Sequence, residues 1–84
     1  MENPFVKYME TNHLSVARMA SRCGVYTNTV MNIAHNGLGV SVASLIRVED
    51  GTAGAVKAQD VVDYYRFLLE TGKMDWPTRE SRKD

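Results

Sequence analysis

Helix-breaking residues recur at short intervals along this chain and limit it to short structural elements. Asn3-Pro4 is typical of a helix start, and Gly24, Asn36-Gly37, Gly51–Gly54 and Gly72 each follow a run of helix-forming residues. Glycine favours the left-handed conformation at helix C-termini, and proline fits the first helical turn. The spacing predicts helices over 4–11, 16–23, 27–35, 42–49 and 58–70, and no alternating pattern indicates a strand. The expected fold is an all-α, compact five-helix domain.

Length and hydrophobicity indicate a single domain. The chain has 84 residues, of which 44% are hydrophobic, and this is enough for one modest core. We expect a domain over 1–72 and a charged, flexible tail over 73–84 that carries Trp76. No apolar run approaches the ~20 residues of a membrane-spanning helix, and no signal peptide is evident. We therefore expect a cytoplasmic protein without membrane contacts.

The sequence lacks the residues that several chemical functions need. A single cysteine, Cys23, excludes an intramolecular disulfide and a multi-cysteine zinc site, and we expect it to be a small core residue. His13, His35 and Cys23 do not have the spacing of a metal site. We identify no nucleophile–base pair and no phosphate-binding loop. The sequence therefore predicts neither an enzyme nor a metal, cofactor or small-molecule substrate.

The segment from Leu14 to Gly37 has the pattern of a helix-turn-helix. This motif needs a small residue where its two helices touch, a glycine in the turn and an apolar residue after the turn. Ala20, Gly24 and Val25 meet these needs in order. Val30 and Ile33 are then placed to anchor the second helix to the core.

The second helix of this segment separates into an apolar face and a polar face. At ~100° per residue, Val30, Ile33 and Ala34 share the apolar side. The polar side combines two amides, a hydroxyl, an imidazole and a thioether without a carboxylate: Thr27, Asn28, Met31, Asn32 and His35. Such groups suit base edges in a major groove, where asparagine binds adenine bidentately and methyl groups contact thymine. These five residues are the predicted base-reading residues.

Gly24-Val25-Tyr26, Val30 and His35-Asn36-Gly37 together resemble the helix-turn-helix of phage Cro/C1-type transcriptional regulators. The later run from Leu45 to Val61 resembles the all-helical Cro/YdaS-type branch of that family. The resemblance implies a lambda-repressor-like fold and a dimer on an inverted-repeat operator, with recognition helices ~34 Å apart. It implies DNA-reading roles for the five residues above and for Tyr26. Candidate phosphate contacts are Arg18, Arg22, Tyr26 and Arg47.

The same residues are also compatible with other interpretations. The polar face would also suit ordinary solvated surface, and His35 would favour a helix C-terminus through the helix dipole. The chain could be an antitoxin or adaptor that acts through protein contacts, or a small phage activator that uses the same DNA contacts. A repressor associated with the bacterial nucleoid is the main expectation.

The helix over 58–70 is more apolar than one buried stripe requires, which favours it as the dimerisation element. The candidate interface residues are Val61, Tyr64, Tyr65, Leu68 and Leu69. Charge is unevenly distributed, although the chain has formal net charge zero. Residues 11–48 contain three arginines and no acidic residue, whereas residues 49–70 contain five acidic residues and two basic ones. The sequence thus predicts a polarised molecule that approaches DNA with its acid-free side.

Overall fold

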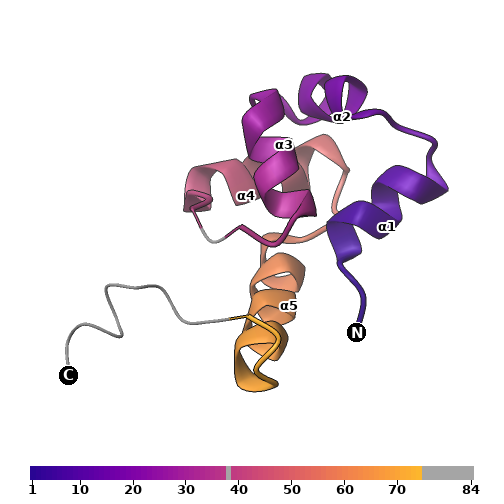
Figure 1. The fold of residues 1–84 in the computed structure, drawn as a ribbon. Helices are drawn as coiled ribbons and strands as arrows, with labels where there is room; N and C mark the ends of the chain where they lie inside the picture. Colours follow the sequence, from indigo (N-terminus) through magenta and orange to yellow (C-terminus); the bar gives the residue numbers. More distant parts are fainter. Residues whose placement is uncertain (38, 75–84) are drawn as a thin grey trace.

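The computed structural model describes residues 1–37 and 39–74, and these form five α-helices without a strand (Figure 1). The all-α, five-helix prediction is confirmed. The helices are α1 (Pro4–Thr11), α2 (Val16–Cys23), α3 (Thr27–Ala34), α4 (Val42–Gly51) and α5 (Ala58–Glu70). α3 ends one residue earlier than predicted, with His35 as its C-cap, and α4 continues beyond Glu49 to Gly51. Within the described residues, no helix combines the length and the apolarity needed to cross a bilayer. Most of the predicted tail, including Trp76, lies outside the described residues.

Side chains cap the starts of three helices. Asn3 accepts hydrogen bonds from the backbone N–H groups of α1, while Ser15 and Ser41 cap α2 and α4 in the same way. Each cap satisfies backbone donors that have no partner inside the helix. These interactions are local, and they explain why the predicted helix starts agree with the structure.

Each helix is closed by a residue in the left-handed conformation: His13, Gly24, Asn36, Ala53 and Gly72. At Gly24, φ is 69°, and the N–H of Val25 donates to the carbonyl of Ala20 at 3.0 Å. This is the bond pattern of a Schellman motif, which turns the chain sharply at the end of a helix. Asn36 closes α3 in the same way, so asparagine rather than Gly37 occupies the left-handed position there.

The core draws apolar side chains from all five helices and from the α4–α5 turn. Its fully buried members include Phe5 of α1, Met19 of α2, Val30 and Ile33 of α3, Val48 of α4, Val56 and Val61. α2 contacts α3 and α4, while α5 contacts α4 and α1. α5 therefore completes the core from the end of the molecule opposite α2 (Figure 1).

The burial of α5 corrects the predicted dimer interface. Val61, Tyr64, Tyr65 and Leu68 have side chains at most 8% exposed, because α1 and α4 cover them within the same chain. They are not available to a second copy in this structure. Only Leu69 of the five predicted residues remains half-buried. So short a chain needs its longest apolar face to build its own core.

α2 and α4 approach one another closely at Gly51. A Cβ atom at this position would lie 2.6 Å from Cα of Cys23 and 2.7 Å from the carbonyl oxygen of Arg22. Only glycine permits this contact, because both neighbouring atoms belong to the backbone of α2. The glycine that reads in sequence as a helix breaker is therefore a packing residue within α4.

Candidate nucleic-acid interface

The turn between α2 and α3 sets the direction of the candidate recognition helix. Gly24 reverses the chain after α2, and the half-buried Val25 packs against the core. Val30 and Ile33, both fully buried, fix one side of α3 to the core. The predicted helix-turn-helix arrangement of these residues is therefore present in the fold, and the opposite side of α3 is left facing outward (Figure 1).

All five predicted base-reading residues are exposed. Met31 is 45% exposed although it is apolar, and Thr27, Asn28, Asn32 and His35 also lie on the surface. A shallow hollow of about 360 Å³ is lined by Asn28, Met31, Asn32, His35 and Gly37. Among the described residues, no hydrogen bond engages the side-chain amides of Asn28 and Asn32. We call this hollow, together with Thr27, the reading face; its amides are free to bind an external partner.

A second hollow, of about 440 Å³, lies at the start of α3. It is lined by Gly24, Val25, Tyr26, Thr29, Ser44 and Arg47. Tyr26 is the N-cap residue, is 85% exposed, and does not cap the helix with its side chain. The Arg47 guanidinium donates to the carbonyl of Gly24 at 3.2 Å, which places a positive charge beside the N-terminus of α3. We call this hollow the α3 entrance; its chemistry suits an anion such as a phosphate.

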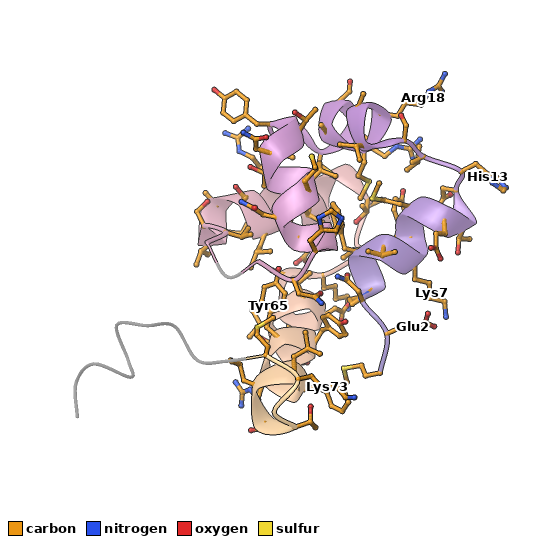
Figure 2. The ribbon with its side chains drawn as sticks, viewed as in Figure 1. Glu2, Lys7, His13, Arg18, Tyr65 and Lys73 are labelled. Carbon is orange, nitrogen blue, oxygen red and sulfur yellow. The ribbon has the colours of Figure 1, made fainter. Side chains whose placement is uncertain are left out.

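The structure brings only two of the four predicted phosphate-contacting residues together. Tyr26 and Arg47 share the α3 entrance. Arg22 instead donates to the Tyr8 hydroxyl of α1 at 3.0 Å and does not line this hollow. Arg18 is exposed and extends from the outer side of α2 (Figure 2).

Two polar side chains of the α3 entrance are absent from the sequence prediction. Thr29 and Ser44 are half-buried and line the hollow beside Arg47. Ser44 lies three residues before Arg47 on α4, a spacing that places both on one helix face. This spacing is the signal that could have identified Ser44 from the sequence. Thr29 carries no comparable signal, because only the tertiary structure brings it to the same hollow as Ser44 and Arg47 of α4.

Asn3 fixes the C-terminal end of α3, which carries the reading face. Its amide nitrogen donates to the carbonyl oxygen of Ile33 at 3.0 Å and to Oδ1 of Asn36 at 3.2 Å. The N–H of Gly37 donates to the carbonyl of Asn32 at 2.6 Å, and a Cβ at position 37 would lie 3.1 Å from that oxygen. α3 is therefore held at its last turn by α1 and by its own Schellman closure.

The thiol of Cys23 is part of the core rather than of the surface. Burial raises the pKa of Cys23, and the Arg22 guanidinium offsets part of this rise. A buried thiol with a raised pKa is a poor nucleophile, which agrees with the expectation of a core residue. Residues 1–37 and 39–74 bring no three His, Cys, Asp or Glu side chains together in a group that could hold a metal.

No protein-family model, curated protein or solved structure matches this chain. The function is therefore inferred from the side chains that the fold brings to the surface of α3. Those side chains are amides, hydroxyls, a thioether and an imidazole, next to one guanidinium at the helix start.

Proposed function

We propose that this protein is a sequence-specific regulator of transcription that binds double-stranded DNA with α3 and acts as a repressor at the bacterial nucleoid. The observation that carries the proposal is the reading face. Val30 and Ile33 anchor α3 to the core, and the opposite side of the helix exposes amides that are free to bind a partner and no carboxylate. An exposed helix after a tight turn fits a major groove. The groups on its face are those that pair with base edges.

The distribution of charge supports the same orientation on DNA. α2, α3 and the first half of α4 contain no acidic residue, whereas Asp60, Asp63 and Glu70 lie on α5 at the opposite end of the molecule (Figure 1). A polarised protein is steered so that its acid-free end meets the phosphates. With few arginines near α3, non-specific binding is weak and base contacts carry most of the discrimination.

We further propose that the protein binds its operator as a homodimer through the exposed side of α5. Val62 is 38% exposed and lies with Arg66, Leu69 and Glu70 around a hollow on the outer surface of the helix, to which the largely buried Tyr65 contributes only a small exposed part. Arg66 and Glu70 are one turn apart. When two copies of α5 pack antiparallel about a two-fold axis that passes midway between these two positions, each arginine faces the glutamate of the other copy. This surface keeps Leu69 of the residues that the sequence indicated and does not use the buried Val61, Tyr64 and Leu68.

The alternative of a protein-binding adaptor loses the observation on which it depended. An antitoxin or adaptor would dock its partner through the long apolar helix α5, and most of the apolar residues of α5 lie in the core. A small activator of transcription would use the same DNA contacts as a repressor, so a reporter assay with the operator upstream of or within a promoter distinguishes these two roles.

The proposal is tested by selecting bound sites from a random pool of duplex DNA. An enriched inverted repeat supports both DNA reading and the dimer. The double variant Asn28→Ala/Asn32→Ala is expected to lose about 1–3 kcal/mol for each base contact and to relax the sequence preference. Gln59→Ala, which removes an exposed amide on α5, serves as the matched control and should bind like the parent protein. Unchanged specificity in the double variant would refute α3 as the recognition helix.

A further inference from the structure

The reading face lacks the side chains that select G·C pairs. Arginine and lysine bind the O6 and N7 atoms of guanine bidentately, and carboxylates accept from the N4 amino group of cytosine. None of these types occurs among Thr27, Asn28, Met31, Asn32 and His35. Asparagine pairs bidentately with N6 and N7 of adenine, and an apolar side chain contacts the thymine methyl group. The two asparagines and the methionine of this face are therefore complementary to A·T pairs.

Helix geometry places the side chains of Asn28, Met31 and Asn32 close together on one face of α3. Asn28 and Asn32 are four residues apart, which corresponds to about 6 Å along the helix axis. Met31 lies between them along the chain, and all three line the same hollow. Base pairs in one strand follow at about 3.4 Å, so two short amide side chains at this spacing reach within about three successive base pairs.

The packing of α3 holds these groups in place before any ligand binds. Asn3 binds the carbonyl of Ile33, and the N–H of Gly37 binds the carbonyl of Asn32, so the last turn is fixed. At the other end, Arg47 binds the carbonyl of Gly24 at the turn that precedes α3. A helix fixed at both ends presents its amides in one register, which favours discrimination between bases over a general affinity for DNA.

We infer that each operator half-site has an A·T core of about three base pairs, in which Asn28 and Asn32 bind adenines and Met31 contacts a thymine methyl group. This inference rests on the proposed function and specifies its ligand. Met31 then has a direct role: its exposed thioether side chain makes the apolar contact that distinguishes thymine from uracil.

The site selection described above separates this inference from the proposed function. Enrichment of A·T pairs at the positions that Asn28→Ala and Asn32→Ala relax supports the inference. Enrichment of G·C pairs at those positions overturns it while leaving the DNA-binding proposal intact. If no sequence is enriched and no salt-sensitive DNA binding is seen, the proposed function fails and the inference fails with it.

The role of Met31 is tested with the enriched site itself. The thymines of the core are replaced by deoxyuracil one at a time, and each replacement removes one methyl group. At the position that Met31 contacts, binding is expected to weaken about threefold to tenfold, because one apolar contact is lost. Met31→Ala should bind the two probes equally, whereas Met31→Leu, which keeps an apolar contact, should restore the difference. Because Met31 is exposed, both variants should fold, and circular dichroism checks this. Equal binding of both probes by the parent protein would overturn the thymine contact.

Discussion

The side-chain amide of Asn3 donates a 3.0 Å hydrogen bond to the carbonyl oxygen of Ile33, thirty positions further along the chain. The same side chain accepts from the N–H of Phe5 at 2.9 Å and so caps α1. One asparagine thus starts the first helix and holds the last turn of the candidate recognition helix. The position of the reading face therefore depends on α1, which contributes no residue to it.

Replacing Asn3 by aspartate should separate these two roles. Aspartate keeps the acceptor that caps α1 but cannot donate to Ile33, and it places a negative charge near the C-terminus of α3. We expect a loss of about 1–3 kcal/mol in the free energy of unfolding, measured by urea denaturation. Asn28→Asp makes the same chemical change on the exposed first turn of α3 and should be nearly neutral for stability. Equal stability of both variants would argue that the hydrogen bond from Asn3 to Ile33 does not stabilise the fold.

Arg47 should contribute one phosphate contact to DNA binding. Arg47→Met is expected to weaken binding to all sequences alike and to reduce the salt slope of the affinity by about one. Arg47→Lys keeps the charge and should keep most of the slope. Lys73→Met removes a cation at the far end of α5 and is the control (Figure 2). A slope that is the same for Arg47→Met and the parent protein would exclude the α3 entrance as a phosphate site.

Gly51→Ala should destabilise the fold although it lies in a helix. In an exposed helix interior, alanine is favoured over glycine by about 1 kcal/mol. Here the added Cβ would lie 2.6 Å from Cα of Cys23, so α2 and α4 must separate. We expect a net loss of about 1–3 kcal/mol, seen as a lower midpoint of thermal unfolding. At Gly39 an added Cβ meets nothing within 4 Å, so Gly39→Ala should leave that midpoint nearly unchanged.

Thr52 is the buried polar residue that closes the α4–α5 turn. Its hydroxyl donates to the carbonyl of Val48 at 2.8 Å and accepts from the N–H of Val56 at 3.0 Å. Thr52→Val keeps the shape but leaves the Val56 N–H without an acceptor, at a cost of about 1–3 kcal/mol. Thr52→Ser keeps the hydroxyl and should lose less. If serine proves more harmful than valine in denaturant unfolding, packing rather than hydrogen bonding fixes this turn.

Tyr65 should make the fold sensitive to alkali. Burial, with a smaller contribution from the neighbouring Tyr64, raises the pKa of Tyr65 from 10.0 to about 12. Because the folded state resists ionisation, this contribution to stability is complete below pH 10 and is lost as the pH rises towards 12. Tyr65→Phe removes the ionisable group and should unfold at higher pH than the parent protein.

The comparison at neutral pH provides the control for Tyr65→Phe. Within the described residues, the Tyr65 hydroxyl is buried without a hydrogen-bond partner, so its removal should not destabilise the protein there. The two proteins should therefore differ in stability chiefly above pH 10. Coincident alkaline transitions, followed by circular dichroism, would show that another group controls alkaline unfolding.

The helix boundaries could be predicted because they depend on neighbours in the chain. Asn3, Ser15 and Ser41 cap helices through bonds to residues two or three positions away, and Gly24 closes α2 through bonds within six residues. The outward side of α3 was predictable for a related reason. Once Val30 and Ile33 are assigned to the core, the helical period fixes which residues lie opposite them.

The outer surface of α5 and the closest contacts could not be predicted in this way. The sequence determined that the chain forms five short helices and that α3 has an apolar and a polar side. Only the tertiary structure decided that Tyr65 and Leu68 lie inside the protomer, that Gly51 meets Cys23, and that Asn3 reaches Ile33. Caps and periodicity act within one turn, whereas these contacts depend on how helices far apart in the chain are oriented against each other.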